Sequence, residues 1–108
     1  MRYEVFLTED AKRDLDELHD YILSHDGIGR ADVVLGHLEE VVRGLSQSPE
    51  RGSHPKELLK LGIREYRQVF FKPYRIIYRV TGRRVHVYVM VDGRRELSAV
   101  LGRRLLWG

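Results

Sequence analysis

Arginine is the residue type in this sequence with the greatest capacity for chemistry. Of the 19 basic residues, 15 are Arg and 4 are Lys. The planar guanidinium group binds carboxylates and phosphates through paired hydrogen bonds. In a nuclease that needs no metal, such groups could stabilise the charged transition state, and the candidates are Arg67, Arg75, Arg79, His86 and Arg95. Arginine is a poor acid or base, so a basic face for an acidic partner is the alternative interpretation.

Five histidines raise the hypothesis of a metal site, but their spacing argues against one. His19 and His25 are six residues apart in a helical segment and therefore point to different faces. His37, His54 and His86 have no second His or acidic cluster at ligand spacing. The sequence also lacks cysteine, a glycine-rich phosphate loop and a Gly-x-Ser-x-Gly element. We therefore expect no metal and no cofactor.

Four tyrosines are interleaved with arginines in the second half of the chain. They are Tyr66, Tyr74, Tyr78 and Tyr88. This arrangement is found in sheets that stack RNA bases and also in ordinary aromatic cores. We favour the core.

The charge of the chain is divided between its two halves. Residues 1–50 contain 5 basic and 12 acidic residues, whereas residues 51–108 contain 14 basic and 4 acidic residues. The formal net charge of +3 therefore hides an acidic half joined to a basic half. Either a positive patch remains available for a partner, or the two halves neutralise each other in the fold.

The composition is typical of one folded domain covering residues 1–108. Hydrophobic residues make up 43% of the chain and charged residues 32%, which is enough apolar surface to build a core. No apolar run approaches the roughly 20 residues of a membrane-spanning helix, and the first residues lack the layout of a signal peptide. We therefore expect a cytoplasmic protein with no membrane partner.

The first half predicts a strand followed by a pair of helices. Apolar residues alternate over residues 2–7, which indicates a strand with one buried face. Thr8 is a good N-cap for an amphipathic helix that ends at Gly27. A second helix is expected over residues 29–46, and a loop over residues 49–55. The two helices form an expected αα-hairpin.

The second half predicts a three-stranded meander and a final helix. A short helical turn is expected over residues 57–61, strands over 64–71, 74–80 and 84–91, and a helix over 94–106. In the last strand we expect the valines at 85, 87, 89 and 91 to share one face, and the strand to lie inside the sheet. The order β-α-α-β-β-β-α with short strand connections predicts an α+β fold, in which the αα-hairpin and the C-terminal helix pack on a mainly antiparallel sheet.

Four segments, taken in order, carry a family pattern. They are Thr-Glu-Asp-Ala-Lys-Arg-Asp-Leu at 8–15, Pro-Glu-Arg-Gly at 49–52, the run over 62–80, and the strand over 85–91 with Asp-Gly-Arg-Arg-Glu-Leu at 92–97. Together they closely resemble the ParE branch of the RelE/ParE toxin superfamily, over nearly the whole chain. The resemblance implies the toxin of a type II toxin-antitoxin system, a class that includes plasmid stabilisation proteins.

The resemblance implies two mechanisms on one fold. RelE-like toxins cut mRNA on the ribosome, whereas ParE-like toxins poison DNA gyrase and have no known hydrolytic chemistry. Arg75 and Arg95 match two arginines of the RelE-like site, but Leu101 stands at the position of its Tyr. The basic pair expected on the first meander strand falls near Arg67 and Val69, so one member of the pair is missing.

These departures favour inhibition of DNA gyrase by protein-protein binding, for which no catalytic residue and no direct contact with nucleic acid is required. One alternative is a ribosome-dependent, metal-independent endoribonuclease built on Arg67, Arg75 and Arg95. The other is an inactive module that keeps the toxin fold for binding alone.

The resemblance also implies a cognate antitoxin, either ParD-like or another small DNA-binding protein, with a tail that folds over the toxin. One expected docking surface is the end of the chain, at Leu105, Leu106 and Trp107. A second is the acidic outer face of the hairpin, for which ordinary solvation is the alternative. This face is expected to contain Asp14, Asp16, Glu17, Asp20, Glu39 and Glu40.

A basic corner is expected where the last strand enters the C-terminal helix. Arg94 and Arg95 would project from a helix N-terminus, where positive charge is unfavourable, and this suggests another use for them. Arg75 and Arg79 alternate on one strand and would extend the patch toward the target. An internal salt bridge that stabilises the corner is the alternative.

Overall fold

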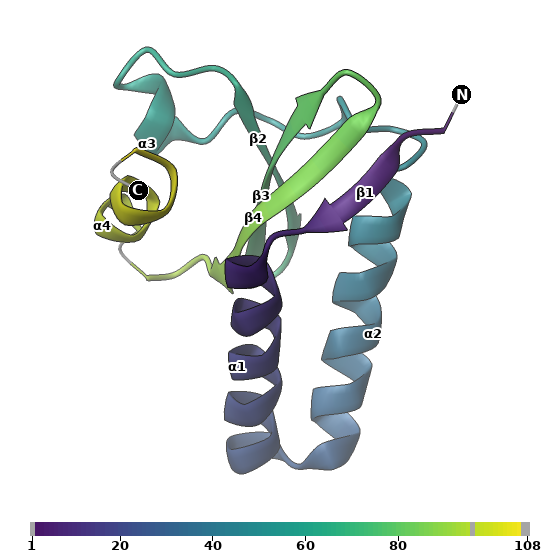
Figure 1. Ribbon diagram of the computed structural model, residues 1–108. Helices are drawn as coiled ribbons and strands as arrows, with labels where there is room; N and C mark the ends of the chain where they lie inside the picture. Colours follow the sequence, from purple (N-terminus) through teal and green to yellow (C-terminus); the bar gives the residue numbers. More distant parts are fainter. Residues whose placement is uncertain (1, 96, 107–108) are drawn as a thin grey trace.

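The elements follow the predicted order, and the predicted α+β class is confirmed. The computed structural model describes residues 2–95 and 97–106 (Figure 1). The elements are β1 (Glu4–Leu7), α1 (Glu9–Asp26), α2 (Ile28–Gly44), α3 (Lys56–Leu59), β2 (Tyr66–Phe71), β3 (Tyr74–Thr81), β4 (Arg84–Asp92), α4 (Ser98–Leu101) and the π-helical turn η1 (Gly102–Leu106). None of the described helices is both long enough and apolar enough to cross a membrane.

Strand β4 lies inside the sheet, as its apolar composition predicts. The strand order is β1-β4-β3-β2. Strands β2, β3 and β4 form an antiparallel meander because their connections are too short for a crossover, whereas β1 pairs with β4 in parallel, with Glu4 opposite Arg84. The hairpin of α1 and α2 packs on one face of the sheet, and α3 and α4 pack on the other (Figure 1).

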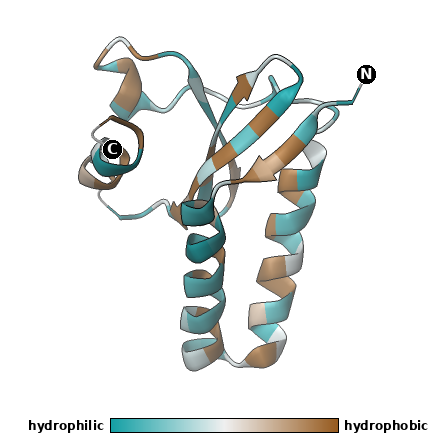
Figure 2. Cartoon of the chain, in the orientation of Figure 1, coloured by the Kyte–Doolittle hydropathy of each residue, from teal (hydrophilic) through white to brown (hydrophobic). Residues whose placement is uncertain are grey.

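The first helix of the hairpin begins, and the turn between the two helices occurs, at residues that the sequence analysis predicts. The Thr8 hydroxyl accepts a hydrogen bond from the Ala11 N–H at 3.1 Å and so caps α1. Gly27 separates the two helices with φ of 88°, a left-handed conformation that favours glycine. The exposed side of α1 is mostly hydrophilic (Figure 2), so the hairpin buries one face of each helix against the sheet.

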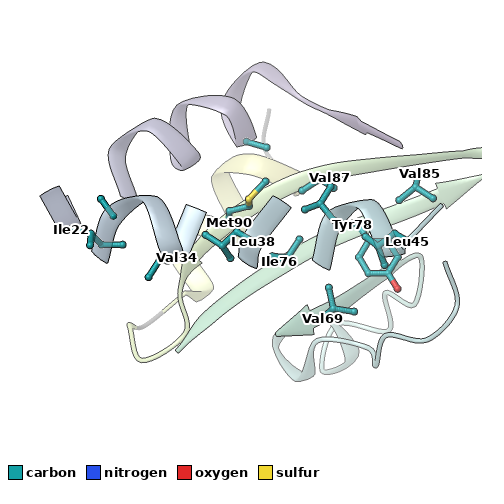
Figure 3. Close-up of a cluster of buried hydrophobic side chains, with 13 residues drawn as sticks. Ile22, Val34, Leu38, Leu45, Val69, Ile76, Tyr78, Val85, Val87 and Met90 are labelled. Atoms are coloured by element: carbon teal, nitrogen blue, oxygen red, sulfur yellow. The ribbon is translucent and has the colours of Figure 1, made fainter. Parts of the chain in front are cut away.

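The larger core fills the space between the hairpin and the sheet (Figure 3). Leu38 of α2, Ile76 of β3 and Val87 of β4 are at most 1% exposed, and their side chains lie in the same cluster. Tyr78 is fully buried there, which confirms a core role for this tyrosine. A smaller core on the opposite face contains Leu58, Tyr66, Ile77, Val89, Val91, Leu97 and Leu101.

A β-bulge at Tyr88 divides β4 into two parts that bury opposite faces. Ile77 pairs with Val89 and Tyr78 pairs with Val87, so Tyr88 is the extra residue. The valines before the bulge face the hairpin, and those after it face α4. The expectation that the four valines share one face is therefore wrong, because one extra residue reverses the alternation of the strand.

The C-terminal helix is shorter than the sequence pattern predicts, and Arg94 and Arg95 lie in a turn before it. The Asp92 carboxylate accepts the Arg94 N–H at 2.9 Å, and the Gly93 N–H donates to the Pro73 carbonyl at 2.7 Å. An Asp side chain that binds the backbone two residues later forms a turn in competition with a helix. The helix consequently begins at residue 98 instead of 94.

Candidate functional site

Arg75 lies inside the fold, although we expected it on an exposed basic surface. Its side chain is 8% exposed. The two terminal nitrogens donate to the Glu57 carboxylate at 2.8 and 3.0 Å, and Nε donates to the Gln68 amide oxygen at 3.0 Å. These hydrogen bonds lower the pKa of the Glu57 carboxyl below its ordinary value of 4.5. The expectation of an exposed Arg75 is therefore wrong, because its ion pair with Glu57 links α3 to β3 of the meander.

Arg67 is likewise occupied by the protein itself. Its Nη1 donates to the Glu50 and Gly52 carbonyls at 3.2 and 2.8 Å. The same loop is fixed by the Tyr78 hydroxyl, which donates to the Pro49 carbonyl at 2.7 Å and accepts the Gly52 N–H at 3.2 Å. A Cβ on Gly52 would lie 2.5 Å from the Gln68 carbonyl oxygen, so glycine is required there. The guanidinium of Arg67 therefore holds a loop against β2.

The positions that a RelE-like reaction would need are not gathered on one surface. Val69 faces the larger core at 8% exposure, and Leu101 faces the smaller core at 1% exposure. Arg95 is exposed beyond the end of β4, whereas Arg75 is buried. Within the described residues, no group of three or more His, Cys, Asp or Glu side chains could hold a metal ion.

The corner after β4 presents one paired and one exposed arginine. Arg94 donates to both carboxylate oxygens of Asp92, at 3.0 Å from Nε and 2.5 Å from Nη2, although its side chain is 76% exposed. The hydrogen bond from Arg94 lowers the pKa of the Asp92 carboxyl. The Arg95 side chain is exposed and forms no ion pair with any residue in the described ranges 2–95 and 97–106. Arg95 is therefore the charge of this corner that is left without an ion pair within the described residues.

A groove of about 680 Å³ lies between α1 and this corner. Arg94 and Arg95 line one side, and Glu17 and Tyr21 of α1 line the other. Tyr74 also lines the groove, and burial raises the pKa of its hydroxyl. The groove thus combines both signs of charge with aromatic surface, which suits a protein partner better than a single small anion.

The comparison with known protein families identifies the chain. Residues 5–97 match the model of a family described as "ParE toxin of type II toxin-antitoxin system, parDE". The chain belongs to the ParE toxin family. A similar curated protein, Toxin ParE3 of Caulobacter vibrioides, is 30% identical over 100 residues, which cover 93% of this chain and 96% of that protein.

Two solved structures share the fold of this ParE-family toxin. One is titled a chromosomal ParDE TA system from P. aeruginosa, with a TM-score of 0.71 and 20% identity, covering 84% of this chain and 96% of that chain. The other is titled the toxin-antitoxin complex RelBE2 from Mycobacterium tuberculosis, with a TM-score of 0.62 and 23% identity, covering 85% and 92%. The chain is therefore a member of the RelE/ParE superfamily, in its ParE-like branch.

Asp14 of the toxin is not on the acidic outer face of the hairpin, where we expected it. It is 6% exposed, and its carboxylate accepts the Met90 N–H at 3.0 Å and two Arg104 N–H groups at 2.6 and 3.0 Å. Arg104 also donates to the Tyr88 carbonyl at 3.1 Å, and its hydrogen bonds to the Asp14 carboxylate raise the pKa of the Arg104 guanidinium. The other five acidic residues of that face, Asp16, Glu17, Asp20, Glu39 and Glu40, are exposed.

The sequence contains a signal for Asp14 that its acidic character obscures. Asp14 follows Ala11 by three residues and precedes Leu18 by four, so it lies on the apolar stripe of α1. Glu57, by contrast, has no comparable signal, because its partner Arg75 is 18 residues away and is chosen by the tertiary fold.

The C-terminal residues of the toxin divide between core and surface. Leu105 packs against the smaller core, whereas Leu106 is 39% exposed. Trp107, the third residue of the expected antitoxin surface, lies outside the described residues. Arg79 is half-buried on β3, with its guanidinium carbon 5.8 Å from the centre of the Tyr66 ring.

Proposed function

We propose that this toxin acts by binding DNA gyrase and is neutralised by a cognate, ParD-like antitoxin. The observation that carries the proposal is the engagement of the arginines that a ribonuclease would need. Arg75 is held by Glu57, and Arg67 is held by loop carbonyls. The buried Leu101 stands at the position of the RelE-like Tyr, so the described residues do not supply the hydroxyl that a RelE-like site uses. The proposal therefore assigns the chain a binding role.

The target-binding surface in this proposal is the corner formed by Arg94 and Arg95, with the groove beside it. Arg95 offers an exposed guanidinium, and Arg94 offers a further charge that Asp92 orients. Arg79, which we expected to extend this patch, is half-buried five residues farther along β3 than Tyr74, the residue opposite Asp92, so it is not part of the corner. Arginine is enriched among the residues that dominate binding energy, because it combines charge with a planar surface.

Gyrase inhibition is tested with a DNA supercoiling assay beside an in vitro translation assay. The purified chain should inhibit supercoiling and leave translation unchanged. The double variant Arg94→Ala with Arg95→Ala should lose at least about tenfold in inhibition, the loss of one binding hot spot. The matched control is Lys60→Ala with Arg64→Ala, which removes the same charge from exposed positions before β2.

Three results would count against this proposal. Codon-specific cleavage of mRNA on ribosomes would assign the chain to the ribonuclease mechanism. Equal effects of the corner variant and its control would show that only net charge matters. A fall in the melting temperature of the corner variant together with its activity would mark the two arginines as structural.

The antitoxin surface in the proposal is the end of the chain. Leu106 is exposed on η1, next to residues that pack on the smaller core, so it could anchor a partner without unfolding the toxin. Titration calorimetry with the product of the neighbouring gene should give a dissociation constant in the nanomolar range or below. Leu106→Asp should weaken this binding by at least about tenfold, whereas Leu61→Asp, at a leucine that is 62% exposed elsewhere, should not. The absence of binding at micromolar concentration would refute the pairing.

A further inference from the structure

A row of aromatic and basic side chains crosses the sheet on the face opposite the hairpin. The register pairs Phe6 of β1 with His86 of β4, His86 with Arg79 of β3, and Arg79 with Tyr66 of β2. Directly paired residues project from the same face of a sheet. The row, which we call the ring row, therefore takes one side chain from each of the four strands.

Ring contacts connect the members of the ring row, with Tyr88 between His86 and Tyr66. The Phe6 and His86 rings stack with their centres 5.4 Å apart and their planes at 21°. Tyr88, the bulged residue of β4, is 6.4 Å from His86 and meets Tyr66 edge-on at 5.6 Å. Arg79 covers the Tyr66 ring at 5.8 Å. The row therefore forms a connected set of rings with Arg79 at Tyr66.

The exposed end of the ring row is the end at β1. Phe6 is 39% exposed, and His86, Arg79 and Tyr88 are half-buried. Tyr66 is 8% exposed and anchors the row in the smaller core. A large aromatic ring that stays exposed on a sheet face, backed by a second ring, is a surface for a flat apolar ligand.

Two arginines beside the exposed rings have no acidic partner among the described residues. Arg79 and Arg84 form no ion pair within residues 2–95 and 97–106, in contrast to Arg75 and Arg94. Glu4 lies opposite Arg84 in the register but is not within salt-bridge distance. On β3, Arg79 lies opposite His86, and Thr81, two residues later, lies opposite Arg84. Arg79 and Arg84 are therefore diagonal neighbours on the same face of the sheet.

We propose that the ring row binds single-stranded nucleic acid, with a base stacked on Phe6, which His86 supports from behind, and phosphates bound by Arg79 and Arg84. Sequence-tolerant binding of single strands combines aromatic platforms with cations that follow the backbone. An acidic peptide would use the arginines but would leave the rings without a matching flat surface. The major groove of duplex DNA admits a helix or a two-stranded ribbon, not a four-stranded face. The inference does not depend on gyrase as the target.

The experiment is fluorescence anisotropy of the full chain with labelled 12-nucleotide probes. The probes are oligo-dT, oligo-rU and a duplex of the same length. Phe6→Leu keeps an apolar side chain but removes the ring, and should raise the dissociation constant for the single strands about 5- to 150-fold, the effect of losing one stacked base. Arg84→Ala should weaken binding and flatten its salt dependence, whereas Arg83→Ala, in the adjacent turn, should do neither.

Melting curves separate these effects from misfolding, since each variant should melt within a few degrees of the wild type. Binding of both single strands supports a general platform, and preference for DNA or RNA identifies the natural source of the strand. Absence of binding at 100 µM, duplex binding that is equally tight, or equal effects of Arg83→Ala and Arg84→Ala would overturn the proposal. Competition by polyglutamate at the same charge concentration would overturn it in favour of an acidic protein partner.

Discussion

Replacement of Glu57 by alanine would leave the Arg75 guanidinium buried without a carboxylate. The two side chains are 15% and 8% exposed and share two hydrogen bonds of 2.8 and 3.0 Å. Removal of one partner from a buried ion pair costs about 3–5 kcal/mol, because the remaining charge cannot regain its hydration. The total unfolding free energy of a small protein is about 5–15 kcal/mol, so we expect a large loss of stability.

Urea denaturation followed by circular dichroism measures this loss. With a slope of about 1–3 kcal/mol per molar urea, the midpoint for Glu57→Ala should fall by at least about 1 M. Glu65→Ala, at an exposed acid before β2, serves as the matched control and should change the midpoint little. The double variant Glu57→Leu with Arg75→Met should recover most of the stability, since an apolar pair needs no hydration.

The reasoning would be refuted by an unfolding free energy of Glu57→Ala within about 1 kcal/mol of the wild type, the range of surface ion pairs. A double variant as unstable as the single variant would also contradict it. Such a result would mean that Arg75 is stabilised by packing, and that its charge is free for another role.

Three further changes test other parts of the structure. Arg75 lowers the pKa of Glu57 in the folded state, so the stabilising contribution of the Glu57 carboxylate is complete above pH 4.5 and disappears as the pH falls through the folded-state pKa. The difference in unfolding free energy between wild type and Glu57→Gln should therefore shrink in denaturation curves from pH 7 to pH 3. A constant difference would contradict the pairing. Tyr78→Phe should cost about 1–3 kcal/mol in urea denaturation, since it leaves the buried loop groups of Pro49 and Gly52 unpaired, whereas Tyr21→Phe, at an exposed position, should cost nothing measurable. Leu101→Tyr should lower the unfolding free energy by about 1–3 kcal/mol, because the larger side chain overpacks the smaller core. The variant should produce no mRNA cleavage in primer-extension mapping. Cleavage by this variant would show that a RelE-like site needs only the added hydroxyl.

The fold was predictable because the apolar residues repeat with the period of each element. The helices of the hairpin and the strands of the meander occur where the periodicity places them, and the short connections dictate antiparallel pairing. The bulge at Tyr88 was not predictable, because valines occupy the alternate positions on both sides of it. An apolar residue suits either face of an interior strand, so the sequence does not record where the alternation reverses.

The candidate site was less predictable than the fold, because the role of an arginine depends on its partner. Arg75 and Arg95 are equivalent in the sequence, yet one is buried against Glu57 and the other is exposed. The partners of Arg75 and Arg104 lie 18 and 90 residues away, and nothing local selects them. Only Asp14 could have been assigned to the interior in advance, from its place on the apolar stripe of α1.

The parallel pairing of β1 with β4 has a consequence for synthesis of the toxin. Glu4 of β1 lies opposite Arg84 of β4 in the strand register, and the Asp14 carboxylate accepts hydrogen bonds from Arg104, so both pairings join residues that are 80 or more positions apart. A ribosome adds about 5–20 residues per second, and it must make the whole segment between β1 and β4 before β1 has a strand to pair with. Until β4 has been made, the nascent chain carries β1 without its partner strand.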